Sequence, residues 1–200
     1  MVIEFFGVPG SGKTTAAREL IKDLAKNEIA VICFIGDISP IRKVLLILRM
    51  VLSFKLNLKF FLDISNLSFR DVANLLYVQS IYLASRNKIV LIDQGFVQAL
   101  ISAKIYNATV PIRNIQKHYQ IFDRIVILCE EPIAIIEDRL KKRNGPSRLE
   151  KMGLEEQELL KWFEETDRIS KELDTKNFFR LKDLGGTYNR IVQVMRILEH

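Results

Sequence analysis

The feature that most constrains the fold is a glycine-rich segment near the N-terminus, GVPGSGKT at residues 7–14. It matches the pattern GxxxxGK[ST], which arises by chance in on the order of one chain in a hundred of this length. An apolar run, VIEFF at 2–6, leads into the glycines, and TTAARELIKDLAK at 14–26 follows them with helical periodicity. Because this strand–loop–helix order is the context in which the pattern forms a phosphate-binding loop, the sequence predicts a nucleoside triphosphate site.

Five residues of this loop have a clear chemical reason to be there. Gly7, Gly10 and Gly12 permit backbone conformations that point N–H groups at phosphate oxygens, and the start of the next helix adds partial positive charge. Lys13 is expected to reach the β and γ phosphates, and the Thr14 hydroxyl is expected to bind Mg²⁺. The remaining predicted nucleotide-binding residues of the loop are Pro9, Ser11 and Thr15.

A carboxylate at the end of a neighbouring strand should hold the water shell of that metal ion. Asp93 ends the apolar run KIVLID and is the natural candidate. A cap for the helix that starts near Gln94 is the alternative role, and it is compatible with metal binding. We therefore predict Thr14 and Asp93 as the metal-binding residues.

The rest of the chain alternates short apolar runs with helical patterns. Strands are predicted at 2–6, 29–35, 88–92, 124–129 and about 177–182, and helices at about 13–26, 40–62, 69–86, 95–106, 132–143, 154–174 and 187–198. Unbroken apolar strands alternating with helices indicate a parallel sheet covered on both faces. The expected architecture is a three-layer α/β/α domain.

Length and composition fit a single globular domain spanning residues 1–200. The chain is 48% hydrophobic and 27% charged, which excludes a disordered or fibrous protein. Cys33 and Cys129 lie in apolar runs without CxxC pairing, so we expect two buried, reduced thiols. The N-terminus has no features of an export signal, which predicts a cytoplasmic protein. A net charge of +6 favours anionic partners such as nucleotides, phosphorylated metabolites, nucleic acid or an acidic membrane surface.

The chain resembles the P-loop kinases of small molecules, the nucleoside and nucleotide kinase group, and most closely its thymidylate-kinase-like branch. Four segments carry the resemblance: GVPGSGKTT at 7–15, FIGDISPIR at 34–42, KIVLIDQG at 88–95 and EDRLKKRNGPSRLE at 137–150. A guanine-specifying NKxD pattern is absent, and DQGF at 93–96 does not match the DxxG switch of GTPases. The resemblance implies a P-loop NTPase fold with strand order 2-3-1-4-5, ATP and Mg²⁺ as cofactors, and phosphoryl transfer to a small molecule.

By this resemblance, residues 37–87 form the acceptor-binding region. Asp37 would orient or deprotonate the acceptor hydroxyl and Arg42 would hold the acceptor, although Asp37 could instead cap the turn before Ser39. Most relatives continue the third strand with Asp-Arg or Glu-Arg, whereas this chain has Gln94 at the substrate-handling position. That change favours a neutral, hydroxyl-bearing acceptor over a nucleoside monophosphate. Three further side chains could face the acceptor: Tyr77, Gln79 and Tyr82.

The resemblance also implies a short lid at about 139–153. Arg139 and Arg143 are four residues apart and would share one helix face. Arg139 would stack on the adenine, while Arg143 and Arg148 would approach the transferring phosphoryl group, where guanidinium charge stabilises the transition state. An ordinary solvated basic face is the alternative.

Segment 41–62 is strongly hydrophobic but carries Arg49, Lys55 and Lys59, which disfavour a transmembrane span. It could pack as a core helix, line the acceptor pocket, form a homodimer interface or touch a membrane surface. A second function class therefore stays open, a nucleotide-dependent binding or regulatory module that engages nucleic acid or an anionic membrane. The chain lacks the aromatic-rich basic motifs of nucleic-acid modules, which disfavours nucleic acid as the partner.

Overall fold

The structure is a computed structural model that describes residues 1–26, 29, 31–34, 39, 41, 44–45, 47–48, 67–84, 89–106, 124–142, 156–173 and 178–181. Four of the predicted site residues lie outside the described residues: Asp37, Arg42, Arg143 and Arg148. The helix predicted at 187–198, most of the helix at 40–62 and most of the lid also lie outside them.

The described chain alternates strands and helices in the predicted order. The strands are β1 (Val2–Phe6), β2 (Val31–Phe34), β3 (Ile89–Ile92), β4 (Arg124–Cys129) and β5 (Phe178–Leu181). The helices are α1 (Lys13–Lys26), α4 (Phe69–Ala84), α5 (Phe96–Tyr106), α7 (Ile133–Lys141) and α8 (Glu156–Glu172). All neighbouring strands pair in parallel, in the order β2-β3-β1-β4-β5, so the predicted fold class and strand order are confirmed.

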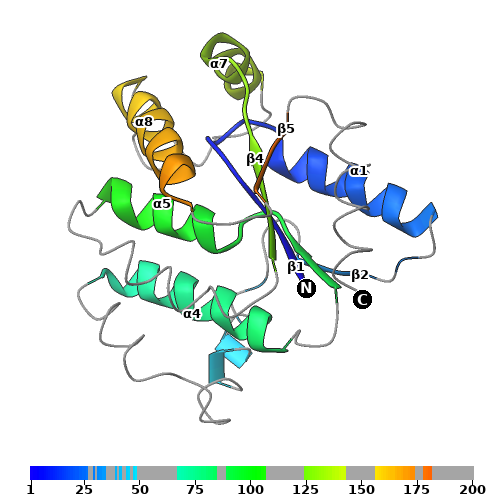
Figure 1. Cartoon of the computed structure of the whole chain (residues 1–200). Helices are drawn as coiled ribbons and strands as arrows, with labels where there is room; N and C mark the ends of the chain where they lie inside the picture. The colour runs from blue at the N-terminus through cyan, green and yellow to red at the C-terminus, as the bar shows by residue number, and fades with distance from the viewer. Residues whose placement is uncertain are drawn as a thin grey trace.

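Helices cover both faces of this sheet (Figure 1), with α4, α5 and α8 on one side and α1 on the other. Alternation along β1 explains the division, because successive side chains of a strand point to opposite faces. Val2 and Phe6 pack in the cluster with α4, α5 and α8, whereas Ile3 and Phe5 pack against α1. Every position of β1 is buried, as expected for a central parallel strand.

The two cysteines differ from the expectation that both are buried. Cys129, on β4 inside the sheet, is buried, whereas Cys33 is exposed. Cys33 lies on β2, which among the described strands pairs with β3 alone and forms an edge of the sheet. An edge strand has a neighbour on one side only, so an apolar run there does not guarantee burial of each side chain.

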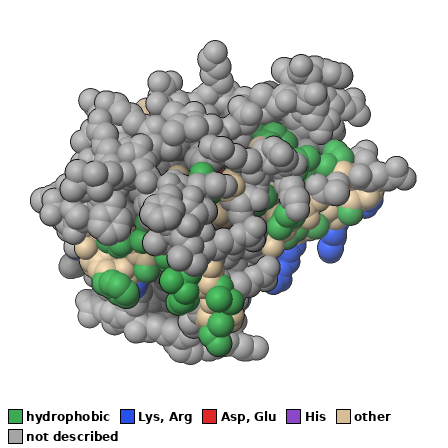
Figure 2. Space-filling view, turned by 90° about the horizontal axis from the view of Figure 1, so that it is seen from below, with side chains coloured by type: hydrophobic (Ala, Val, Ile, Leu, Met, Phe, Trp, Pro, Cys, Tyr) green, Lys and Arg blue, Asp and Glu red, His purple; other side chains and the backbone are tan. Residues whose placement is uncertain are grey.

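The hydrophobic segment that begins at residue 41 is only partly described. Ile47 packs against the core, while Ile41, Val44, Leu45 and Leu48 are exposed. Figure 2 shows a face on which hydrophobic atoms of described residues lie among residues that are not described. Over its described part the segment is therefore not a fully buried core helix. Among the described helices, none combines the length and the hydrophobicity that a transmembrane span requires.

Parallel pairing brings the carboxyl ends of β1, β3 and β4 together along the same side of the sheet, where the strands end. The chain leaves β1 into the glycine-rich loop, leaves β3 into Asp93, and leaves β4 into Glu130 and Glu131. In open α/β sheets this edge is where ligands bind. Three segments distant in sequence therefore meet where the loop was predicted to hold phosphates.

Candidate phosphate-binding site

The glycine-rich loop joins β1 to α1 and adopts backbone conformations that favour glycine. Gly7, Gly10 and Gly12 have φ angles of 146°, 91° and 84°. At Gly7 space is also limiting, because a Cβ atom there would lie 2.5 Å from the carbonyl oxygen of Cys129. Glycine thus permits both the turn and the close approach of β4 to the loop.

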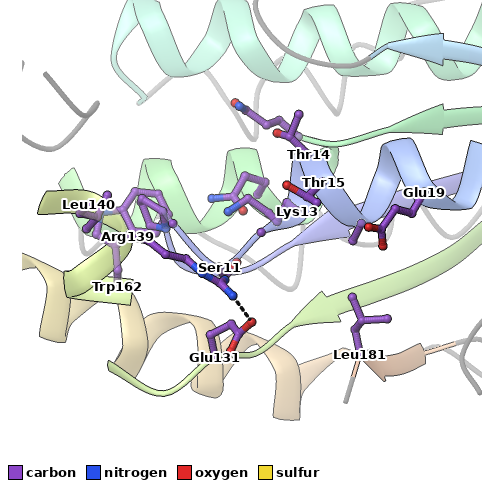
Figure 3. A pocket seen from close by; sticks show the side chains of 16 residues that line it. Ser11, Lys13, Thr14, Thr15, Glu19, Glu131, Arg139, Leu140, Trp162 and Leu181 are labelled. Atoms are coloured by element: carbon purple, nitrogen blue, oxygen red, sulfur yellow. Dashed lines mark hydrogen bonds and ion pairs between the residues drawn. The ribbon is translucent and has the colours of Figure 1, made fainter. Parts of the chain in front are cut away.

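Lys13 is the first residue of α1 and crosses the inside of this loop. Its Nζ donates hydrogen bonds to the carbonyl oxygens of Gly7 (2.9 Å) and Val8 (2.8 Å). The ammonium group therefore lies within the loop, beside the pocket that the loop lines (Figure 3). An anion entering the pocket meets this charge and the positive end of α1 together.

Thr14 and Asp93, the predicted metal-binding pair, lie in contact. The Thr14 hydroxyl donates to Asp93 Oδ2 at 2.7 Å, and Asp93 is buried at the end of β3. A hydroxyl and a carboxylate are oxygen ligands of the kind that Mg²⁺ prefers. The described residues hold no group of three or more His, Cys, Asp or Glu side chains that could bind a metal. The donor set thus fits a cation that takes its other ligands from a nucleotide and water.

Glu4 accepts hydrogen bonds at the start of the helix that follows Asp93. Helix α5 begins at Phe96, and the amides of Phe96 and Val97 donate to Glu4 Oε2 at 2.6 and 3.4 Å. Glu4 therefore caps these two amides, while Asp93 Oδ2 accepts the hydroxyl hydrogen of Thr14.

A pocket of about 510 Å³ opens over the loop, a size typical of small-molecule sites. Residues 9–15 line one side and Gln94 and Gln98 line another. Side chains of α7, α8 and β5 also line it: Arg139, Leu140, Trp162 and Leu181 (Figure 3). The pocket therefore combines a charged, glycine-rich side with an apolar side, as a nucleotide with phosphates and a base requires.

Helix α7 packs directly against the loop and brings Arg139 to it. A Cβ atom at Gly10 would lie 3.1 Å from Ile136, and one at Gly12 would lie 3.5 Å from the Arg139 guanidinium. Arg139 donates to the Glu131 carboxylate at 2.9 Å, and both side chains are partly exposed. Exposed ion pairs of this kind are weak, so Arg139 can exchange Glu131 for an anionic ligand at little cost.

Two buried polar residues at this site were not predicted from the sequence. Gln98 accepts a hydrogen bond from the Gly7 amide at 3.0 Å, and Glu4 accepts one from the Tyr82 hydroxyl at 2.7 Å. Glu4 has a sequence signal, since it is the one charged residue within the buried strand VIEFF. Gln98 has none, because a glutamine within a helical pattern is ordinary. Tyr82, considered above as an acceptor-facing residue, instead points at Glu4.

Glu4 is fully buried, and its carboxylate joins several elements. Its Oε1 lies 3.8 Å from the guanidinium of Arg124, which is also buried. Burial, and then the negative charge of Glu4, raise the pKa of Tyr82 well above its usual range, so Tyr82 remains a hydroxyl donor. A Cβ atom at residue 95 would lie 2.1 Å from Glu4 Oε2, which explains the glycine after Gln94.

Comparison with known proteins supports the fold of the chain. No protein-family model matches the chain, and no curated protein matches it in sequence. Among solved structures it is similar to deoxyadenosine kinase from M. mycoides with the products dCMP and a flexible dCDP bound, at a TM-score of 0.55 and 17% identity. That match covers 99% of this chain and 100% of the other.

The same enzyme with bound dATP gives a TM-score of 0.57 and 18% identity, covering 98% of this chain and 100% of the other. This chain has the fold of a P-loop nucleoside kinase. The similarity extends over the whole kinase fold and confirms the fold predicted from the sequence motifs. Assignment to the thymidylate-kinase-like branch stays a prediction.

Proposed function

We propose that this protein is an ATP- and Mg²⁺-dependent phosphotransferase that moves the γ-phosphoryl group to a small metabolite. One observation carries the proposal: Lys13 and the Thr14–Asp93 pair converge on the same edge of the sheet, where the loop lines a pocket. Motors and switches share this loop, so the loop alone supports only nucleotide binding. The similarity of fold to a deoxyadenosine kinase over the whole length of both chains supports the narrower proposal.

The residues of the chain divide the work in the proposed reaction. Lys13 would exchange its two carbonyl partners for phosphate oxygens, which offer a full negative charge. Thr14 and Asp93 would hold Mg²⁺, which when bound neutralises charge on the phosphates. Ser11 Oγ is buried without a hydrogen-bond partner among the described residues, so the loop has a further polar group to offer a ligand.

Arginines on and beyond α7 are proposed to complete the donor side. Arg139 lies beside Gly12 and lines the pocket, in reach of a bound nucleotide. We propose that it stacks on the adenine, and that Arg143 and Arg148 stabilise charge on the transferring group. These roles come from the resemblance of 137–150 to the kinase lid.

The acceptor is proposed to be a neutral molecule with a hydroxyl group. Gln94 lines the pocket at the position where most nucleotide kinases carry an arginine. A neutral amide cannot balance the charge of an acceptor phosphate, but it can hydrogen-bond a hydroxyl or a base. Asp37 would orient or deprotonate that hydroxyl and Arg42 would hold the acceptor. Since the similar structures are of a deoxyadenosine kinase, nucleosides are the first acceptors to test.

The proposal is tested by offering labelled ATP with Mg²⁺ to a panel of nucleosides and to the matching nucleoside monophosphates. We expect transfer to at least one neutral hydroxyl acceptor and poorer transfer to its monophosphate. The Gln94→Arg variant should shift this preference toward the monophosphate, because it restores the missing cation. Salt-dependent binding of nucleic acid or anionic vesicles, with no transfer to any acceptor, would instead support a regulatory binding module.

A further inference from the structure

We propose that Gln98 is a positioning residue that fixes the first peptide of the phosphate-binding loop and, through it, Lys13. Gln98 lies in the first turn of α5, 91 residues from Gly7 in sequence, and its side chain is only 6% exposed. Its Oε1 atom accepts the Gly7 amide hydrogen at 3.0 Å. The inference rests on the proposed function only in taking ATP as the ligand of the loop.

Both backbone polar groups of Gly7 are engaged in this arrangement. The amide donates to Gln98, and the carbonyl oxygen accepts from Lys13 Nζ at 2.9 Å. Gly7 has a φ of 146° and no room for a side chain, so its conformation must be held by hydrogen bonds rather than by packing of its own side chain. The hydrogen bond to Gln98 therefore fixes the orientation of Gly7, whose carbonyl oxygen accepts from Lys13.

Hydrogen bonds hold the start of helix α5 against β1, so that Gln98 has a fixed position beside the loop. Its first amides donate to the buried Glu4, and a carboxylate at a helix N-terminus is favoured by the helix dipole. Glu4 lies three residues before Gly7 on β1, so the same strand that enters the loop also holds the helix. Just ahead of α5, Asp93 accepts from Thr14. The segment 93–98 thus contacts the loop at its first glycine and again at its end.

A purely structural role for Gln98 makes a different prediction. If Gln98 only satisfied a buried amide, its loss would lower stability but leave the folded protein with unchanged ATP affinity. If it positions the loop, its loss changes ATP affinity in the folded protein. Gln98 also lines the pocket, which places the contact at the ligand surface rather than in the distant core.

The test uses Gln98→Met, which keeps the length of the side chain and removes the acceptor. Two quantities are measured at a temperature where the variant is folded: hydrogen exchange of the Gly7 amide, and the Kd for Mg·ATP. Trp162 is the single tryptophan, is 4% exposed and lines the pocket, so its fluorescence can report binding. We expect Gly7 exchange to accelerate and ATP binding to weaken, each about tenfold, as for loss of one buried hydrogen bond.

Ser102→Ala is the matched control. Ser102 lies one turn further along α5, is equally buried at 6% exposure, and does not line the pocket. It should leave both the Gly7 exchange rate and the Kd for ATP unchanged. Should Gln98→Met fail to fold, Gln98→Asn keeps the amide but shortens its reach, and the same two changes are expected.

The outcomes separate this inference from the proposed function. A folded Gln98 variant with wild-type ATP affinity overturns the inference alone, whether or not its Gly7 amide exchanges faster. ATP binding that depends on Gln98, without phosphoryl transfer to any acceptor, supports the inference and overturns the proposed function. A wild-type protein that binds no ATP overturns both.

Discussion

At the scale of single residues, two cysteines that look alike in the sequence differ in burial. Cys129 ends β4 beneath the loop, and burial raises the pKa of its thiol to about 12, with the Lys13 ammonium opposing the rise and Glu131 adding to it. Cys33 lies exposed on the edge strand, although partial burial also raises its pKa. Since the thiolate is the reactive form, the two side chains should behave differently toward electrophiles.

Thiol labelling of the native protein near pH 8 should therefore modify one cysteine. We expect Cys33 to react and Cys129 to react only after unfolding in denaturant. Mass spectrometry of the labelled peptides identifies the site, and Cys33→Ser should abolish labelling of the native protein. Rapid modification of Cys129 in the folded protein would contradict the burial described here.

The raised pKa of Cys129 predicts a loss of stability in alkali. Folding raises the pKa of Cys129 from its ordinary value of 9.0 to about 12. Below pH 9 the thiol is protonated in both states, so its contribution is fully present. Between pH 9 and 12 only the unfolded state loses the proton, so the free energy of unfolding falls by up to about 1.4 kcal/mol per pH unit. Urea unfolding at pH 8 and pH 10.5 should show a smaller decrease for Cys129→Ala than for wild type; equal decreases would contradict the account.

At the scale of secondary-structure elements, Glu4 ties β1 to α4, α5 and β4. Its carboxylate accepts from Tyr82 on α4 and from Phe96 on α5, and lies near Arg124 on β4. Removal of this group takes away the carboxylate that lies 3.8 Å from the buried guanidinium of Arg124. The association of α5 with the sheet therefore combines apolar packing with hydrogen bonds to one buried carboxylate.

Glu4→Ala should lower the free energy of unfolding by about 3–5 kcal/mol, the usual cost of breaking a buried ion pair from one side. Chemical denaturation measures the change. Asp138→Ala, which removes an exposed carboxylate paired with Lys142, is the control and should cost no more than about 1 kcal/mol. Similar small effects for both variants would show that the Glu4 contacts contribute little.

Gly95→Ala tests the close approach of the same elements. The added methyl group would lie 2.6 Å from Glu4 Cβ as well as near its carboxylate. Neither backbone segment can easily move away, because Glu4 is on the central strand β1 and residue 95 directly precedes α5. We expect a loss of about 1–3 kcal/mol in unfolding free energy, typical of overpacking. In the Glu4→Ala background the same substitution should cost less, because the obstructing side chain is gone. Additive costs would contradict a direct clash.

At the scale of the whole molecule, the sequence pattern predicts the elements of the fold well, and the reason is burial. Each central strand is buried on both faces, so it appears as an unbroken apolar run whose limits differ from the observed strand by at most two residues. Periodicity contains no information on which strands are neighbours. The order β2-β3-β1-β4-β5 came from the resemblance carried by the motifs, and the structure confirms it.

Some residues of the candidate site were predictable from the sequence and others were not. The proximity of Lys13, Thr14 and Asp93 was predictable because a local motif and the ends of parallel strands bring them together. Gln98 and Glu4 were missed as parts of the site because their partners, Gly7 and Phe96, lie 91 and 92 residues away. Hydrogen bonds between such distant residues follow from the packing of α5 on β1, which a pattern along one segment does not encode.

Phosphoryl transfer measured without a chosen substrate tests the central claim most directly. The protein is incubated with Mg·ATP and a metabolite extract, and mass spectrometry searches for species that gain one phosphoryl group. We expect such a species with the wild type and a loss of at least about 100-fold with Lys13→Ala, because the loop then lacks the positive charge that stabilises the phosphates. The absence of any phosphorylated product, or equal product with Lys13→Ala, would contradict it.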